Sequence, residues 1–347
     1  MSLNNPSNNA MQDTINKLIV KEKGILAIDE SLITIAKRFA SINLENTEEN
    51  RCKYRSLLAT TKNLSNYIGG AILFEETLTQ KIYADQFKVK DPKNLTIAQQ
   101  FSNSGILIGI KVDQGLMSIY PNDLEKVTKG LDSLTDDLNK YKNNGVKFAK
   151  WRAVININSN SQLPSKVAIH VNAEQLARYA AICQNLGIVP IIEPEVLMDG
   201  EHNLEECAKI TEKVLLKVFK ALRKHQVKLE YIILKPNMIL PGKDCKIIYN
   251  PQNIAEHTLK VLKTTVPAIV PSINFLSGGQ SEIDATINLN AINKLGIAPW
   301  HLSFSFGRAL QESCLKIWAG EDSNINSAQA ALLERARLNS LANLGQL

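Results

Sequence analysis

Charged side chains directly follow short apolar runs at several points of this sequence. Lys235 comes straight after the apolar segment Tyr231–Leu234, so its ammonium group would begin in apolar surroundings. Free lysine is almost fully protonated at neutral pH. Burial and a second cation such as Lys150 would favour the neutral amine, which is a nucleophile. Lys235 is therefore a candidate nucleophile, and a structural ion pair with Glu193 or Glu195 is the alternative.

Two carboxylates, Glu193 and Glu195, are separated by one residue. On an extended segment they point to the same side, with Cα atoms about 6.6 Å apart. Crowded carboxylates favour a state in which one is protonated and the other is ionised. Such a pair supplies an acid and a base for forming and dehydrating a carbinolamine, although two solvated acids before a loop would look the same. Lys150 and Arg152 have the same spacing and predict a cationic pair.

Glycine and arginine residues follow the last two apolar runs, as Ser277-Gly278-Gly279 and Gly307-Arg308. Glycines let backbone N–H groups approach an anion, and a guanidinium can bind phosphate through two parallel hydrogen bonds. In an α/β barrel, the loops after the last two strands are a frequent phosphate site. These two segments together therefore predict a phosphate site.

Composition argues against several classes of protein. The 40 Lys and Arg residues exceed the 34 Asp and Glu residues by only six and are dispersed, which argues against nucleic-acid binding. The five histidines and five cysteines lack the usual metal-ligand spacings, so neither a metal nor a cofactor is expected. Charges interrupt every apolar stretch, so no membrane span is expected. With no signal-like N-terminus and an odd number of cysteines, we predict a cytoplasmic protein.

The elements that must position these residues form a repeating pattern. Eight apolar runs begin 33 to 44 residues apart: Gly24–Ile28, Ile68–Phe74, Ile106–Val112, Phe148–Ile155, Ile188–Ile192, Tyr231–Leu234, Ala268–Leu276 and His301–Phe306. Continuous apolar runs are typical of parallel strands covered by helices. Eight such units without a linker predict one α/β domain over residues 1–347, a (β/α)8 TIM barrel with parallel strands and outer helices. We expect residues 1–13 to be a flexible N-terminus.

Amphipathic segments between the runs predict the outer helices. They are Asp123–Asn143, Glu174–Leu186 with Asn172 as N-cap, Glu205–His225, Pro251–Thr264 and Ser281–Leu295, with a last helix at Ser327–Asn343. A doubly wound open sheet is the alternative fold. It would more usually carry a G-x-G-x-x-G turn after the first strand, where this chain has Asp29-Glu30-Ser31-Leu32.

The carboxyl ends of barrel strands carry the chemistry in this fold. Charged residues stand at the ends of seven of the eight runs, and the seventh run is followed by a glycine-rich segment instead. Charges are rarely placed against a core unless they are paired or take part in function. We therefore expect Asp29, Lys150, Glu193 and Lys235 to meet at one mouth of the barrel.

Nine segments, in order along the chain, extend this pattern: Gly24–Ser31, Asn46–Arg51, Gly109–Asp113, Phe148–Arg152, Ile191–Glu195, Leu234–Met238, Phe275–Ser281, Asn288–Asn293 and Phe304–Leu310. They resemble the class I fructose-bisphosphate aldolase family from about residue 14 to residue 344. The resemblance implies a (β/α)8 barrel that reversibly cleaves fructose 1,6-bisphosphate to dihydroxyacetone phosphate and glyceraldehyde 3-phosphate, without a metal or cofactor.

The resemblance also implies roles for single residues. Lys235 would form the Schiff base. Glu193 would serve as acid and base in carbinolamine dehydration, with Glu195 beside it. Asp29 would accept the proton of the C4 hydroxyl, and Lys150 would stabilise charge near the reacting carbons.

The same resemblance implies two phosphate sites and an assembly. One phosphate would be held by Ser277, Gly278, Gly307 and Arg308, and Ser31, Arg38 and Lys111 would lie near the other. Arg152 and Ser305 complete the predicted substrate-binding residues. Family members are usually tetrameric, so we expect a homo-oligomer that binds sugar phosphates in the cytoplasm.

Other functions stay open on the sequence. A Schiff-base enzyme could prefer fructose 1-phosphate or sedoheptulose 1,7-bisphosphate, which relative kcat/KM values would distinguish. A cytoskeleton-binding scaffold without activity and a metal-dependent aldolase are further alternatives.

Many members of the resembled family continue into a tail that ends in tyrosine and assists protonation of the enamine. This sequence ends at Leu347, shortly after Asn339–Ala342. We therefore expect slower enamine protonation, or another group in that role. Kinetics with C–C cleavage as the slow step would contradict this expectation.

Overall fold

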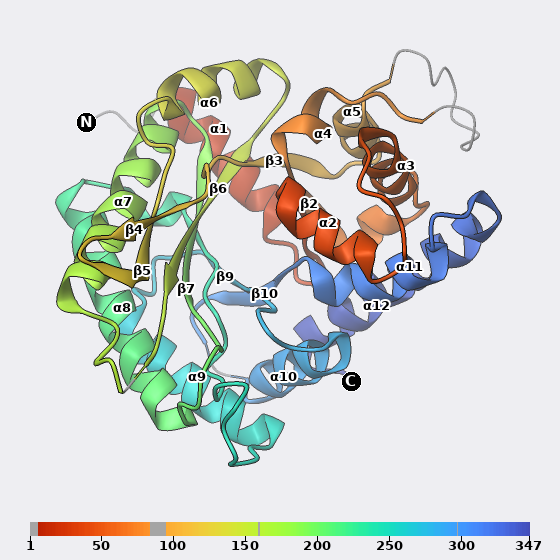
Figure 1. Cartoon of the computed structure of the whole chain (residues 1–347). Coiled ribbons are helices and arrows are strands. Elements are labelled where there is room, and N and C mark those ends of the chain that lie inside the picture. Colours follow the sequence, from red (N-terminus) through yellow and green to blue (C-terminus); the bar gives the residue numbers. More distant parts are fainter. Residues whose placement is uncertain (1–5, 84–94, 159, 297) are drawn as a thin grey trace.

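The computed structural model describes residues 6–83, 95–158, 160–296 and 298–347. Its barrel strands are β1 (Gly24–Ile28), β2 (Ile68–Leu73), β3 (Leu107–Lys111), β6 (Phe148–Ile155), β7 (Val189–Val196), β8 (Ile233–Leu234), β9 (Ser272–Phe275) and β10 (His301–Phe306). They close in the order β1-β10-β9-β8-β7-β6-β3-β2, with every neighbouring pair parallel (Figure 1). Each strand lies on one of the eight apolar runs, although β7 continues beyond its run through Glu193 and Glu195 to Val196. This arrangement confirms the predicted barrel and excludes the open sheet.

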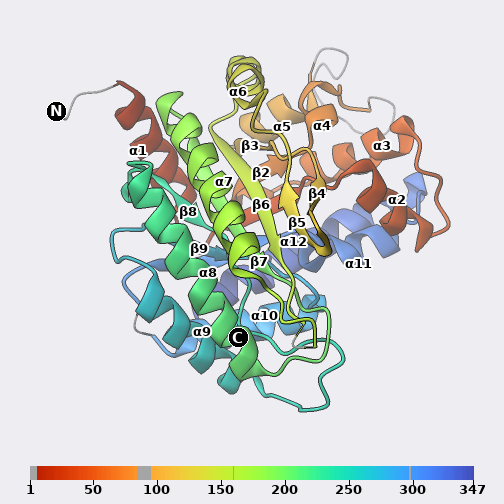
Figure 2. The same ribbon diagram turned by 60° about the vertical axis from the view of Figure 1, so that its left-hand side comes forward.

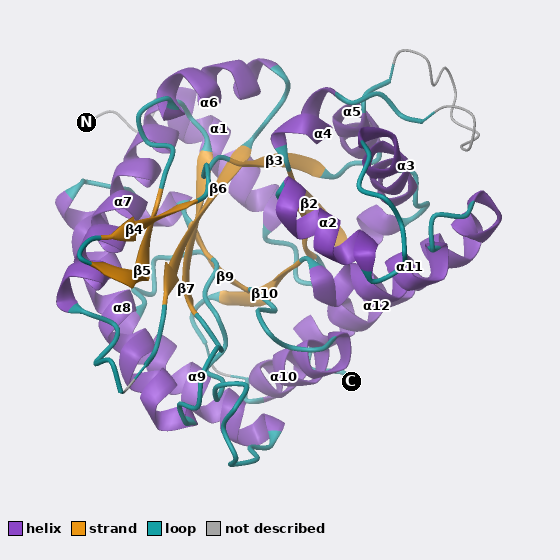
Figure 3. Ribbon diagram, viewed as in Figure 1, coloured by secondary structure: helices purple, strands orange, loops and turns teal. Residues whose placement is uncertain are grey.

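Helices surround the strands, as the purple and orange ribbons of Figure 3 show. They are α1 (Pro6–Leu18), α2 (Leu32–Ala40), α3 (Glu48–Ala59), α4 (Glu75–Thr79), α5 (Ile97–Asn103), α6 (Leu134–Asn143), α7 (Lys166–Asn185), α8 (Leu204–Lys224), α9 (Pro251–Thr265), α10 (Glu282–Lys294), α11 (Arg308–Trp318) and α12 (Ile325–Asn343). Short 3₁₀ turns lie at Leu64–Asn66, Leu229–Tyr231 and Asp322–Asn324. None of the helices in the described ranges has the length and apolar character needed to cross a membrane.

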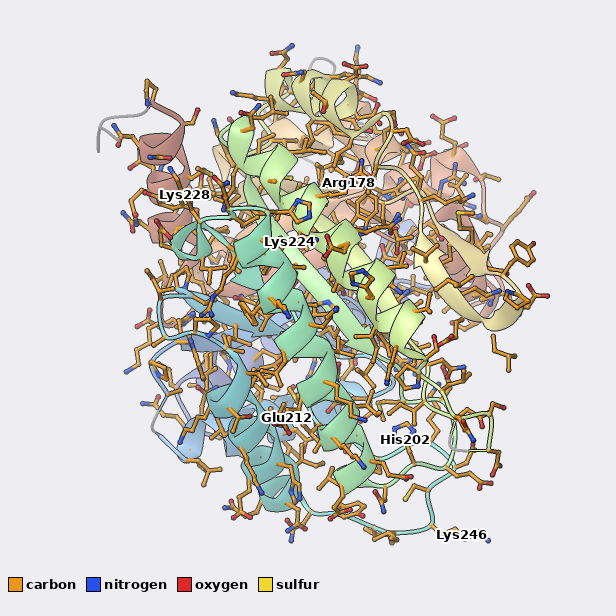
Figure 4. The ribbon with its side chains drawn as sticks, turned by 90° about the vertical axis from the view of Figure 1, so that its left-hand side faces the viewer. Arg178, His202, Glu212, Lys224, Lys228 and Lys246 are labelled. Carbon is orange, nitrogen blue, oxygen red and sulfur yellow. The ribbon has the colours of Figure 1, made fainter. Side chains whose placement is uncertain are left out.

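Helices α7, α8 and α9 run side by side outside the barrel (Figure 2). Seen from this side, their outer faces carry charged groups such as Arg178, Glu212 and Lys224 (Figure 4). Lys224 lies 3.4 Å from Glu174 across the α7–α8 boundary. Charged groups of this kind keep the outer surface polar, while the opposite faces of the helices bury apolar side chains against the strands.

The inside of the barrel changes from apolar to charged along β1, β6 and β7. Every second residue of a strand points inward, so one interior row can carry both kinds of side chain. Interior residues near the strand starts belong to one buried apolar cluster, and those at the strand ends line a cavity. The rows are Ile25, Ala27 and Asp29 at β1; Phe148, Lys150 and Arg152 in β6; and Val189, Ile191, Glu193 and Glu195 in β7.

Helix α1 packs across the starts of the strands. Its buried Met11, Ile15 and Leu18 are spaced by four and three residues and join the interior cluster that contains Phe148. We expected residues 1–13 to be flexible. Residues 1–5 lie outside the described ranges, but from Pro6 onward the chain is helical, because this apolar stripe is buried against the barrel.

The helix predicted at Asp123–Asn143 is wrong over its first part. Strands β4 (Leu116–Ile119) and β5 (Asn122–Thr128) instead form an antiparallel hairpin, and only α6 is helical. In β5 the burial alternates, with Glu125 and Val127 buried and Leu124 55% exposed. This period of two, stabilised by contacts of β5 with β6 and α7, outweighs the helix-like spacing of the apolar residues.

Asn172 is not an N-cap. Helix α7 begins at Lys166, and the Ser165 hydroxyl caps it by accepting a hydrogen bond of 3.0 Å from the backbone N–H of Ala168. Asn172 is an interior residue of α7, and its side-chain amide donates a hydrogen bond of 3.0 Å to the backbone carbonyl of Lys126. Asn172 therefore joins α7 to the hairpin instead of starting the helix.

Gly109→Ala should destabilise the barrel. A Cβ atom at Gly109 would lie 2.1 Å from Cε2 of Phe148, and overpacking of a core costs about 1–3 kcal/mol. Phe148→Leu removes the ring, so the alanine should cost much less in that background. Urea unfolding of both single variants and of the double variant measures this coupling. If the two single losses in the free energy of unfolding add up to the loss in the double variant, the proposed contact between position 109 and the Phe148 ring would be contradicted.

Candidate active site

A cavity of about 1200 Å³ opens at the carboxyl ends of the strands. All fourteen residues that the sequence assigned to catalysis or substrate binding line it. They are Asp29, Ser31, Arg38, Lys111, Lys150, Arg152, Glu193, Glu195, Lys235, Ser277, Gly278, Ser305, Gly307 and Arg308. The barrel thus brings together side chains from seven different strand ends.

The Lys150 side chain lines this cavity, and its ammonium faces three carboxylates. Its Nζ is 2.8 Å from Asp29 Oδ2, 3.3 Å from Glu193 Oε2 and 3.5 Å from Asp113 Oδ2. The Lys150 side chain is only 3% exposed. Buried charges are costly unless they are paired, and here the ammonium and the carboxyl groups compensate one another.

This arrangement changes proton affinities. Burial raises the pKa of Asp29, but the ammonium groups of Lys150 and Lys235 outweigh burial and hold that pKa far below its usual value. Burial likewise lowers the pKa of Lys150, and the three carboxylates more than reverse this and raise it. Asp29 is therefore a carboxylate, and Lys150 a cation, throughout the neutral range.

Lys235 lies beside this group. Its Nζ is 3.2 Å from Glu193 Oε1, while the second oxygen of Glu193 faces Lys150. Glu193 thus bridges the two lysines. The ion pair that we considered as the structural alternative exists, and it also places a carboxyl group within reach of any group attached to the Lys235 amine.

Glu195 has a different partner from Glu193. Its Oε2 accepts a hydrogen bond of 2.5 Å from Nε of Arg152. The predicted carboxylate pair and the predicted cationic pair therefore combine across strands, Glu193 with Lys150 and Glu195 with Arg152. The partners lie on the adjacent strands β6 and β7, whose register aligns Arg152 with Glu193.

The predicted phosphate loop is closely packed. A Cβ on Gly278 would lie 2.5 Å from Glu195 Oε1, so a larger residue there would displace this carboxylate, and Gly279 has a φ of +76°, which favours glycine. Arg308, at the start of α11, donates a hydrogen bond of 2.8 Å to the carbonyl of Gln280 and so joins this loop to the end of β10. The Ser305 hydroxyl, 1% exposed, lines the same cavity without a hydrogen-bond partner among the described residues.

Arg38 differs from expectation. We grouped it with Ser31 and Lys111, but its Nη2 lies 3.4 Å from the position that a Cβ would take on Gly307, beside the first phosphate segment. Its Nη1 is 2.5 Å from Glu30 Oε1. Ser31 caps α2 by accepting from the N–H of Thr34 at 3.3 Å.

Sequence reasoning missed three polar residues of this site. Asp113 stands in the segment Lys111-Val112-Asp113, so its position at a strand end was a usable signal. Glu30 pairs with Arg38 and follows Asp29 directly. Gln311 is buried and donates to Glu30 Oε1 at 3.0 Å and to the carbonyl of Ala27 at 2.7 Å. No local pattern indicates Gln311, because Ala27 and Glu30 are more than 280 residues away from it in sequence.

The arrangement suits chemistry on a phosphorylated carbonyl compound. A lysine amine, a bridging carboxyl group and an ionised aspartate supply a nucleophile, an acid–base group and a base within one cavity. Glycine backbone and arginine at its edge can bind an anion. Over the described ranges, no cluster of three or more His, Cys, Asp or Glu side chains is placed to hold a metal ion.

Comparison with known proteins gives a consistent result. The family model of class I fructose-bisphosphate aldolase, described as glycolytic, matches residues 10–347. A cytosolic fructose-bisphosphate aldolase of Arabidopsis thaliana is 53% identical over 93% of this chain and 80% of its own. A fructose-bisphosphate aldolase of Toxoplasma gondii is 50% identical over 97% of this chain and 90% of its own.

A solved structure agrees with these relatives. The fructose-bisphosphate aldolase of Plasmodium falciparum, crystallised in complex with TRAP and a small-molecule inhibitor, superposes with a TM-score of 0.94. It is 47% identical, and the match covers 100% of this chain and 97% of that one. The chain belongs to the class I fructose-bisphosphate aldolase family, a family of lyases.

Proposed function

We propose that this protein reversibly cleaves fructose 1,6-bisphosphate to dihydroxyacetone phosphate and glyceraldehyde 3-phosphate through a Schiff base on Lys235. The observation that carries the proposal is the position of Lys235, with its Nζ 3.2 Å from Glu193 in the cavity that holds the other predicted residues. Family membership supports the same reaction. In cells the reaction belongs to glycolysis and gluconeogenesis.

Imine formation uses Lys235 and Glu193. A proton moves from the Lys235 ammonium to Glu193, and the neutral amine attacks the C2 carbonyl of the open-chain ketose and forms a carbinolamine. Glu193 donates a proton to the C2 hydroxyl, which leaves as water, and a protonated imine remains. The short separation of the two side chains supports this role, because a proton donor must lie within hydrogen-bond reach of its target.

Cleavage uses Asp29 and Lys150. Asp29 accepts the proton of the C4 hydroxyl while the C3–C4 bond breaks, and the electron pair of that bond moves into the imine to form an enamine. Glyceraldehyde 3-phosphate then leaves; protonation of the enamine and hydrolysis release dihydroxyacetone phosphate and restore Lys235. Lys150, 2.8 Å from Asp29, keeps the aspartate ionised and offsets negative charge at the reacting carbons.

The two phosphates hold the reacting bond over Lys235. Ser277, Gly278, Gly307 and Arg308 bind one phosphate, and Arg38 is placed to assist them. Ser31 and Lys111 bind the other, and Arg152 and Ser305 contact the sugar between the phosphates. Fixing both ends of the substrate turns binding energy into orientation.

The biological setting is a further part of the proposal. Relatives whose names include cytosolic or cytoplasmic support a cytoplasmic location. Because the same relatives are named fructose-bisphosphate aldolases, they also support sugar phosphates as ligands. The homotetramer stays a prediction from the family resemblance. That residues 1–347 form a single catalytic domain, and that the reaction needs neither a metal nor a cofactor, are predictions as well.

Borohydride trapping tests the Schiff base. Reduction in the presence of dihydroxyacetone phosphate and EDTA should leave an adduct on Lys235, because hydride reduces the imine to a stable amine. Mass spectrometry of peptides locates the adduct. Lys235→Met should give none and should lose activity. A folded protein that binds the ligand but gives no adduct would disprove the proposed reaction, and loss of activity in EDTA alone would indicate a metal-dependent one.

Lys150→Met should lower kcat by at least about 100-fold, since the cation closest to Asp29 and to the developing charge is lost. Without that cation, burial dominates and the pKa of Asp29 rises. The acid limb of the kcat/KM profile should therefore move to higher pH. Lys150→Arg keeps the charge and should move the limb less. An acid limb that stays in place in Lys150→Met would contradict this role.

A further inference from the structure

Lys111 already has an anionic partner before any substrate is present. Its Nζ lies 2.8 Å from Asp113 Oδ1, and it also donates a hydrogen bond to the backbone carbonyl of Asp113. The two side chains are only 14% and 8% exposed, so water screens the pair weakly. Two of the three ammonium protons are thus used within a three-residue segment. The cation assigned to the second phosphate therefore begins as half of an ion pair.

Asp113 faces a second ammonium group as well. Its other oxygen, Oδ2, lies 3.5 Å from Lys150 Nζ. Burial raises the pKa of Asp113, but Lys150 and Lys111 outweigh burial and lower it, so Asp113 is ionised at neutral pH. Its carboxylate therefore lies between the lysine at the end of β3 and the lysine in β6.

The two lysines depend on Asp113 to different degrees. Lys150 keeps two closer carboxylates, Asp29 at 2.8 Å and Glu193 at 3.3 Å. For Lys111, Asp113 is the one carboxylate within 4.0 Å over the described ranges. Loss of the Asp113 charge would thus leave Lys111 without a carboxylate within 4.0 Å among the described residues, while Lys150 would stay paired. A negative group entering from the cavity would meet a much more available Lys111.

We propose that Asp113 is a built-in counter-ion that competes with the second phosphate of the substrate for Lys111. In this way it limits the preference of the site for bisphosphorylated over monophosphorylated ketoses. The proposal rests on the proposed function. A bisphosphate must displace Asp113 from Lys111 or share the ammonium with it, and the lost ion pair subtracts from binding. A ketose with a single phosphate at C1 leaves the Lys111–Asp113 pair intact.

Asp113→Asn isolates this competition. Asparagine has nearly the same size and keeps a carbonyl oxygen that can accept from Lys111, so the variant changes mainly the charge. We expect KM for fructose 1,6-bisphosphate to fall about 3- to 10-fold, as for loss of one charge-assisted contact. KM for fructose 1-phosphate should change less than about twofold, and kcat should fall by a similar factor for both substrates, because Lys150 is common to both. The ratio of the two kcat/KM values should therefore rise.

Two controls separate competition from a general change in charge. Asp137→Asn removes a carboxylate that lines the same cavity but accepts hydrogen bonds from Ser133 and Gln114. The ratio of the two kcat/KM values should therefore not change in this variant. In a Lys111→Met background, Asp113→Asn should no longer alter the ratio, because the cation that both anions seek is absent. Asp113→Glu, which keeps the charge, should stay close to the parent protein.

The outcomes separate the two proposals. A parent protein without a borohydride adduct on Lys235 would overturn the proposed function. An adduct in the parent and in Asp113→Asn, with equal changes in kcat/KM for both ketoses or a higher KM for the bisphosphate, would overturn only the competition and leave Asp113 as a group that positions Lys111. Should circular dichroism find Asp113→Asn unfolded, Asp113→Ser takes its place in the same comparison, with the same criteria.

Discussion

The rest of this molecule depends on the buried ammonium of Lys150. Three carboxylates from the ends of β1, β3 and β7 surround it, and Lys235 completes the group through Glu193. Each of these charges would be costly to bury alone, and each has an oppositely charged group within about 3.5 Å. The ionised state of Asp29 and the position of Glu193 at Lys235 both follow from this mutual dependence. A scaffold that allowed these strand ends to shift relative to one another would lose the charge balance and the acid–base geometry together.

The closed barrel meets this requirement through strand alternation. In β6 the same interior row begins with Phe148, continues with Lys150 and ends with Arg152. The Phe148 ring packs against Gly109 in the interior of the barrel near the strand starts, and α1 covers this apolar end of the barrel. Packing at the strand starts therefore holds the charged residues two and four positions further on. Neighbouring strands are hydrogen-bonded in fixed register, with Lys150 opposite Ile191 and Arg152 opposite Glu193, so the charged side chains of β6 and β7 keep their relative positions.

Ion pairs also prepare the edges of the cavity. Glu195 holds Arg152, Glu30 holds Arg38 and Asp113 holds Lys111, so the cations that would meet a phosphorylated ligand are ordered in advance. Ordering them in advance saves the entropy of fixing long side chains on binding. The same pairs also set a cost, because an incoming phosphate must compete with a carboxylate that is already bound. Selectivity in such a site depends on internal anions as much as on the cations that touch the substrate.

The eight strands, six of the twelve helices in the described ranges and the charged strand ends could be predicted from the amino-acid order, because apolar runs and helical periodicity are local properties. The family resemblance added roles to fourteen residues, and all of them line one cavity. Contacts between distant segments determined the rest. The 116–128 hairpin depends on β6 and α7, and the first helix depends on the barrel interior that it covers. The places of Arg38, Gln311 and Asp113 likewise depend on partners from other strand ends, since neither burial nor an ion pair across a barrel can be read from neighbouring residues alone.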